Sequence, residues 1–143
     1  PDIEHVNQIK QVAENLNNAM TALSNGLQDK TEILGNINYT DADQDKKDAY
    51  NAAIAHAENI LDKANGGNVP QTEVEQALTQ LQETANDLNG NQRVADAKAQ
   101  AKTDIDQLTH LNNEQQTAIK QNIDNATQLQ PIAQIVEQAT QLN

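Results

Sequence analysis

Apolar residues recur at alternating steps of three and four through the first part of the chain. The stripe comprises Val6, Ile9, Ala13, Leu16, Met20, Leu23 and Leu27. Because a helical turn holds 3.6 residues, these side chains share one face, and the pattern predicts a long amphipathic helix. Gly26, Gly35 and the stretch 36–40 weaken the helical preference. We therefore expect a loop over residues 29–40.

Two more helices are predicted before residue 90. An acidic cluster at 41–45 precedes the first of them and the glycines 66–67 follow it, an order that suits the helix dipole and a glycine cap. The next helix is expected after Pro70, where Thr72 and Glu75 have the spacing of a capping box. The apolar stripes of the two helices are Ala49, Tyr50, Ala53, Ile54, Ala57, Ile60, Leu61 and Ala64, then Val74, Ala77, Leu78, Leu81, Ala85 and Leu88.

Three further helices are predicted after a polar break at 89–91. The first should end near Leu111, the second starts where Asn113 and Gln116 have capping-box spacing, and the third has Pro131 in its first turn. Their stripes are Val94, Ala97, Ala101, Ile105 and Leu108; Ala118, Ile119, Ile123 and Ala126; and Ile132, Ile135, Val136, Ala139 and Leu142. The predicted fold is all-α, with six helices in two consecutive three-helix bundles joined end to end in a rod-like array.

The two ends of the chain resemble each other. Residues 132–143 read IAQIVEQATQLN and residues 6–17 read VNQIKQVAENLN, with five identities at an offset of 142 − 16 = 126. Such an offset is typical of a repeat period, in which the last helix continues as the first helix of the next unit. The chain begins at Pro1 without a methionine or a signal-like segment. We therefore expect it to be one piece of a longer protein.

Three stretches carry a resemblance to a known family. They are L-N-x-A-M-x-x-L at 16–23, YNAAIAHAENIL at 50–61 and L-N-G-x-x-x-V-A-D-A-K at 88–98. In these stretches the chain resembles the repeats of the giant staphylococcal extracellular matrix-binding proteins, which combine a FIVAR-type and a GA-like three-helix module. The resemblance covers the whole chain.

The resemblance implies a division and a function. Residues 1–90 would form a FIVAR-like bundle whose long first helix is partly shared with an upstream repeat, and residues 91–143 a GA-like bundle. The parent would be a very long, extracellular, cell-wall-associated protein implicated in adhesion to host matrix such as fibronectin. The GA-like modules are related to albumin-binding ones.

The composition argues against an enzyme. Hydrophobic residues make up 36% of the chain and aromatic residues 1%, with no Phe and no Trp. A substrate cleft is usually lined by large apolar and aromatic groups, and this chain has few to supply. Zero cysteine excludes disulfides and thiolate metal sites.

The charge narrows the choice of partner. The formal net charge is −12 and Arg93 is the sole arginine, so we do not expect nucleic acid to bind. No apolar run approaches the roughly 18 residues that span a bilayer, and insertion of this fragment into a membrane is not expected. Neighbouring repeats of the same chain are the expected partners, together with host matrix or serum proteins, and the fragment itself is expected to be a monomer.

Several residues are candidates for metal binding or catalysis. Asp41, Asp43 and Asp45 imitate the start of an EF-hand loop, but Lys46 stands where glycine is needed and Ala52 where glutamate is needed. The acids are therefore interpreted as a helix start. The three histidines and the lone serine lie outside any ligand or nucleophile motif, and these are His5, His56, His110 and Ser24.

Tyr50 lies on an apolar stripe and is predicted to be core, whereas Tyr39 stays undecided. We expect no catalytic, cofactor-binding or metal-binding residues and no cofactor.

Two functions remain. The first is a structural and adhesive rod that acts through many weak contacts. The second is a discrete protein-binding module, in which the GA-like half binds albumin or another serum protein through an exposed apolar or aromatic patch. No such patch is expected, because the helix over 113–126 is polar outside its short stripe. The sequence therefore favours the first function.

Overall fold

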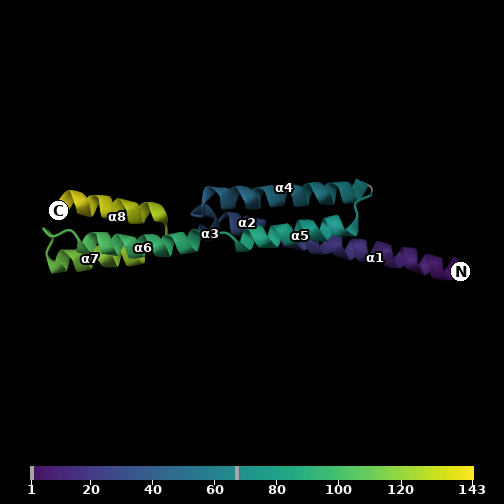
Figure 1. The fold of residues 1–143 in the computed structure, drawn as a ribbon, viewed down its shortest axis with the longest axis horizontal. Helices are drawn as coiled ribbons and strands as arrows, with labels where there is room; N and C mark the ends of the chain where they lie inside the picture. The colour runs from purple at the N-terminus through teal and green to yellow at the C-terminus, as the bar shows by residue number, and fades with distance from the viewer. Residues whose placement is uncertain (1, 67) are drawn as a thin grey trace. The chain divides into compact units, whose positions relative to one another are not determined.

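The computed structural model describes residues 2–66 and 68–143, and these residues contain eight helices and no strand (Figure 1). The helices are α1 (Asp2–Leu27), α2 (Lys30–Leu34), α3 (Ile37–Thr40), α4 (Gln44–Gly66), α5 (Gln71–Asn86), α6 (Gly90–Asp106), α7 (Asn113–Asn125) and α8 (Leu129–Leu142). They form two compact units. The first unit contains the chain up to Gly35 and Gln44–Leu88, and the second contains Asn36–Asp43 and Asn89–Asn143.

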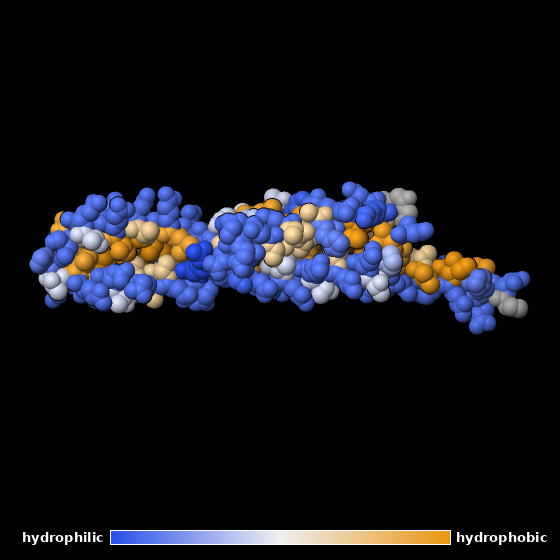
Figure 2. Space-filling view, turned by 45° about the horizontal axis from the view of Figure 1, so that its top comes forward, coloured by the Kyte–Doolittle hydropathy of each residue, from blue (hydrophilic) through white to orange (hydrophobic). Residues whose placement is uncertain are grey.

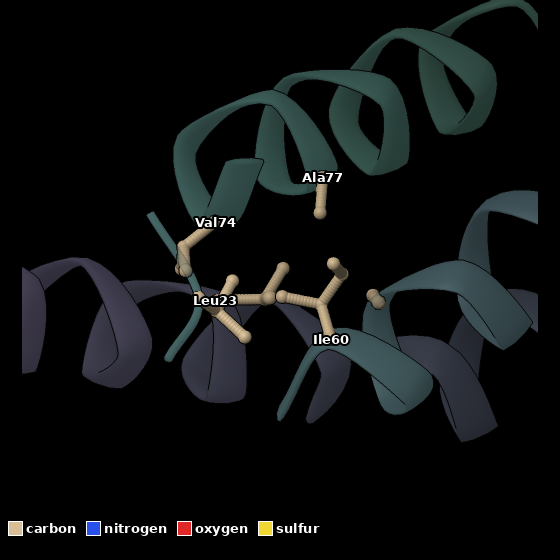
Figure 3. Packing of buried hydrophobic residues seen from close by; sticks show 6 residues of the cluster. Leu23, Ile60, Val74 and Ala77 are labelled. Atoms are coloured by element: carbon tan, nitrogen blue, oxygen red, sulfur yellow. The ribbon is translucent and has the colours of Figure 1, made fainter. Parts of the chain in front are cut away.

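The first unit is a bundle of α1, α4 and α5. Its core consists of Leu23, Ala57, Ile60, Val69, Val74 and Ala77. Figure 3 shows Leu23, Ile60 and Val74 pointing toward one another from the three helices. Leu, Ile, Val and Ala fill this core, as a chain without Phe or Trp requires. Tyr50 is also fully buried, which agrees with its predicted place in the core.

The second unit is a bundle of α6, α7 and α8. Its core consists of Val94, Ala101, Ile105, Ile123, Ile132 and Ala139. The short helix α3 contacts α6, and the side chain of Ile37 packs against this core. A segment from between α2 and α4 is therefore part of the second unit.

The predicted all-α fold and its six long helices are confirmed, but the loop expected over 29–40 is wrong. That stretch forms α2 and α3. The side chain of Asn36 accepts a hydrogen bond from the Asn38 amide and so starts α3, and Gly35 is the C-cap of α2. Of the residues interpreted as helix breakers, Gly35 and Asn36 are therefore caps, and Ile37–Thr40 are helical.

Local boundaries also differ from the expectation. The capping box of α7 is formed by Asn112 and Gln115, one residue before the predicted pair. Pro70 is the N-cap of α5, so Thr72 is already helical. The helix predicted to end near Leu111 ends at Asp106. In the predicted glycine stop of α4, Gly67 lies outside the described residues.

Candidate functional site

An exposed apolar stripe lies along the first half of α1. Ile3, Val6, Ile9 and Val12 are 79%, 61%, 57% and 65% exposed, respectively. In Figure 1 this part of α1 extends past the ends of α4 and α5, and Figure 2 shows orange surface on it. We call these four residues the α1 stripe. Large aliphatic side chains gathered on one exposed helix face are typical of an interaction surface.

The α1 stripe has a counterpart in α8. At the offset of 126, the alignment extends backwards so that Leu129, Ile132 and Ile135 correspond to Ile3, Val6 and Ile9. These three residues of α8 all belong to or pack against the core of the second unit, and Ile132 is only 3% exposed. The same sequence pattern is thus packed against a core in α8 and exposed in α1.

The far end of α8 shows the opposite relationship. Leu142 is 63% exposed, whereas Leu16, its counterpart at the same offset, packs against the core of the first unit. Three of the four residues of the α1 stripe therefore correspond to residues that are packed in α8, whereas Val12 corresponds to Gln138, which is exposed.

A second polar feature is formed by residues 36–43, which we call the capping segment. The Asn38 side chain oxygen accepts a hydrogen bond from the Asn91 amide at 3.0 Å, and the Asp41 carboxylate accepts one from the Leu129 amide at 2.9 Å. Both amides lie at the starts of helices, where N–H groups have no partner within the helix. The N-cap residues of α6 and α8 make no side-chain cap of their own. The capping segment therefore supplies both caps.

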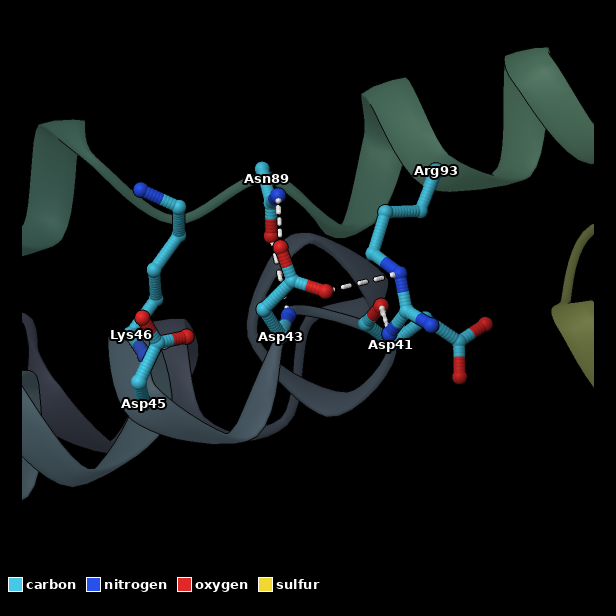
Figure 4. A network of polar contacts seen from close by, with 6 residues as sticks. All are labelled: Asp41, Asp43, Asp45, Lys46, Asn89 and Arg93. Carbon is cyan, nitrogen blue, oxygen red and sulfur yellow. Dashed lines mark hydrogen bonds and ion pairs between the residues drawn. The ribbon is translucent and has the colours of Figure 1, made fainter.

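Arg93 and Asn89 fasten this segment (Figure 4). Arg93 Nη1 donates to the Asp41 carbonyl at 2.9 Å, and its Nε lies 3.2 Å from Asp43 Oδ1. Asn89 Nδ2 donates to Asp43 Oδ2 at 2.8 Å, and the Asp43 amide donates back to Asn89 Oδ1 at 2.9 Å. The sole arginine of the chain thus has a structural position.

Gly90 allows the two backbones to meet. A Cβ atom added there would lie 2.1 Å from the Ile37 carbonyl oxygen and 2.7 Å from that of Asn38. No side chain fits into that space, so glycine is required by close approach of the backbone. The sequence pattern at 89–91 predicts only a break between helices. In the sequence, the available signal for this tertiary contact was the Gly90-Asn91 pair close to Arg93, the sole arginine.

The candidate metal-binding and catalytic residues do not come together in one site. Asp41 and Asp43 bind the groups described above, and the Asp45 carboxylate accepts from the Lys46 amide at the start of α4. The His110 amide donates to the Asn143 side chain at 2.9 Å. His5, His56 and Ser24 are exposed and Tyr39 is half-buried. Across residues 2–66 and 68–143, no group of three His, Cys, Asp or Glu side chains could hold a metal ion.

Within the same described ranges, no helix is both long enough and apolar enough to cross a membrane.

Each of the two units matches a known type of helical repeat module. The family model of the FIVAR domain matches residues 19–89, and that of the GA module matches residues 91–143. The chain belongs to the family of staphylococcal extracellular matrix-binding repeats, as its resemblance implied. The capping segment lies inside the FIVAR match, although it packs with the GA-type unit.

Curated relatives from Staphylococcus aureus support this assignment. The chain is 65% identical over 102 residues, 71% of its length, to the extracellular matrix-binding protein ebh of strain MRSA252. It is 54% identical over its whole length to the extracellular matrix-binding protein EbhA of strain Newman. The chain spans only 1% and 4% of the lengths of these two proteins.

Two crystal structures from the same organism are similar as well. A domain of EbhA matches 96% of this chain with a TM-score of 0.90 at 32% identity, and 57% of that domain is covered. A second domain, described as similar to streptococcal adhesins, matches 87% of this chain with a TM-score of 0.80 at 34% identity, and 98% of it is covered. The chain is thus a repeat of the Ebh type.

Proposed function

We propose that the chain is a non-catalytic structural and adhesive repeat of a long bacterial cell-surface protein. In this proposal successive repeats form a helical rod outside the cell, associated with the cell wall, and the rod binds host extracellular matrix such as fibronectin. The names of the relatives support a matrix-binding role, and none of those reported above is the name of an enzyme. Residues 1–90 and 91–143 act as the FIVAR-like and GA-like parts, with the capping segment shared between them.

The α1 stripe is the observation that supports the proposed rod. In a continuous array, α8 of one repeat would run into α1 of the next, and Val6 and Ile9 would take the places that Ile132 and Ile135 occupy here. Full burial of each such side chain stabilises by about 1.5–3 kcal/mol. A helix shared in this way leaves no flexible linker between repeats.

The test is a protein that carries two copies of the repeat in tandem at the 126-residue period. Amide hydrogen exchange at Val6 and Ile9 of the downstream copy should be slower than in the single chain, because a preceding bundle covers them. The same amides of the upstream copy serve as the internal control and should stay fast. Equal exchange in both copies would contradict the shared helix.

The GA match supports a second candidate, a discrete module that binds albumin or another serum protein. Such a module would bind as a single copy, whereas an adhesive rod gains affinity from several weak sites. Binding of fibronectin and of albumin to one copy and to an array of copies separates the two candidates. Affinity that rises steeply with copy number supports the rod, and full affinity for albumin in one copy supports the module.

A further inference from the structure

A shallow apolar groove runs between α6 and α8 of the second unit. Its volume is about 490 Å³, and its apolar lining consists of Ala97, Ala101, Leu129, Ile132, Ala133 and Val136. Figure 2 shows this side of the unit as a band of orange and tan between blue borders. Three of the six residues are alanines, whose short side chains leave the space between the two helices unfilled.

The groove differs from the expectation that the GA-like half lacks an exposed apolar patch. That expectation rested on the helix over 113–126, and the outer face of α7 indeed presents four polar residues beside Ala118, which are Asn113, Glu114, Thr117 and Gln121. The groove lies away from α7, and Leu129 and Val136 are only half-buried in it. The two apolar stripes were visible in the sequence, but how far apart α6 and α8 lie was not.

The charges around the groove are acidic. Its two charged lining residues are Asp104 of α6 and Glu137 of α8, one from each bordering helix. The second unit contains four Lys and Arg residues and eight Asp and Glu residues, so its formal net charge is 4 − 8 = −4. The negative borders are therefore part of a negative unit.

The four bases of that unit are bound elsewhere. Lys98 donates to the Asp124 carbonyl and Lys102 to its carboxylate, at the C-terminal end of α7. Lys120 pairs with Asp106, and Arg93 holds the capping segment. No basic side chain of the described second unit lines the groove, so Asp104 and Glu137 stand without a neutralising partner from Lys or Arg.

We propose that this groove is a docking surface for a basic amphipathic helix of a partner protein. The lining of α6 from Ala97 to Asp104 rises roughly 10 Å, enough for two turns of a bound helix. The partner would place large apolar residues at i, i+3 or i+4, and i+7 over the alanines, as helix-in-groove complexes do. Its Lys or Arg side chains on both flanks would reach Asp104 and Glu137.

A second copy of this chain fits less well. Its exposed helix face is the α1 stripe, and the first turn of α1 carries Asp2 and Glu4. Like charges would then meet at the acidic border. The inference adds a contact surface to the proposed adhesive function and does not depend on the shared helix.

The test uses the single chain and a synthetic amphipathic peptide of about four helical turns that contains only leucine and lysine. We expect it to shift the amide NMR signals of Ala97, Ala101, Ala133 and Val136. The same peptide with glutamate in place of lysine should not bind. Equal binding of both peptides, or shifts spread over both units, would overturn the proposal.

Two variants locate the site. Ala133→Gln places a longer uncharged side chain over the groove and should weaken binding about tenfold or more, equivalent to about 1.4 kcal/mol. Ala118→Gln makes the same change on the outer face of α7 and should leave affinity unchanged. Equal effects of the two variants on peptide affinity would refute the assignment. So would a dimer of the chain, seen by sedimentation, that Ala133→Gln dissociates, because the groove would then bind a second copy.

Charge reversal at the acidic borders tests the same groove without Ala133→Gln, in case that variant disturbs the fold. The double variant Asp104→Lys/Glu137→Lys should lose the leucine–lysine peptide and gain the leucine–glutamate one. An unchanged preference would refute a role for the acidic borders. Because all of these measurements use one copy, their failure leaves the tandem exchange result untouched, and failure of the tandem test leaves these unaffected.

Discussion

The carboxylate of Asp41 accepts a hydrogen bond from the Leu129 amide, 88 residues further along the chain, at 2.9 Å. This bond caps α8, whose N-cap Gln128 makes none. Removing a side-chain cap costs about 1 kcal/mol. Asp41→Ala should therefore destabilise the second unit by about that amount, measured by hydrogen exchange in α8 and α6. Asp45→Ala, which removes only a local bond to Lys46, is the control and should leave these amides unaffected.

Gly90→Ala should disturb the same junction through the backbone. The added methyl would lie 2.1 Å from the Ile37 carbonyl oxygen, so the capping segment must move. Overpacking of this kind costs about 1–3 kcal/mol. Chemical denaturation should show that loss, whereas Gly35→Ala, whose Cβ would lie 3.5 Å from the Thr31 carbonyl oxygen, should be nearly neutral. Similar stability of both variants would mean that the contact at Gly90 is loose.

A fragment of residues 91–143, the range of the GA match, lacks the capping segment. The Leu129 amide then loses its acceptor, Asp41, and Asn91 becomes the N-terminal residue. We expect the first turn of α8 to exchange faster in the fragment than in the whole chain, with a lower melting temperature. Identical protection in both would show that the capping segment adds no stability.

Ile123 is fully buried in the second unit, and Ile123→Asp places a charge there without a partner. Such burial costs several kcal/mol, comparable to the stability of a small bundle. Exchange should become fast throughout α6, α7 and α8 while α4 and α5 stay protected. Complete unfolding of the whole chain would instead indicate that the two units fold as one.

Calcium and zinc should leave the melting temperature unchanged. A bound ion stabilises the folded state by mass action, but Asp41 and Asp43 already accept hydrogen bonds from protein groups. Scanning calorimetry with millimolar calcium, with zinc and with a chelator makes the comparison. A rise of several degrees with either metal would contradict this prediction.

The long helices could be predicted from the sequence because their apolar periodicity records burial directly. Leu23 and Ile123 lie on predicted stripes and are fully buried. The same periodicity could not distinguish Val6 from Leu23, since a stripe reports one face of a helix and not whether that face has a partner. Only Leu23 has one within this chain.

The capping segment could not be predicted from local pattern. Asn38 and Asp41 are stabilised by amides 53 and 88 residues away, and sequence rules for caps consider only neighbouring residues. Its polar residues therefore suggested a loop.

The groove between α6 and α8 could not be predicted either, because the spacing of two helices depends on which small residues, such as Ala101 and Ala133, face each other in the fold.

The discontinuous second unit bears on how such proteins could lengthen during evolution. The chain passes between the units after Gly35, after Asp43 and after Leu88. No single cut therefore yields two complete units, because a break at residue 88 leaves the capping segment on the wrong side. A gene duplication that copied one half alone would deliver either a bundle without its caps or a cap without its bundle. The heritable unit is the pair.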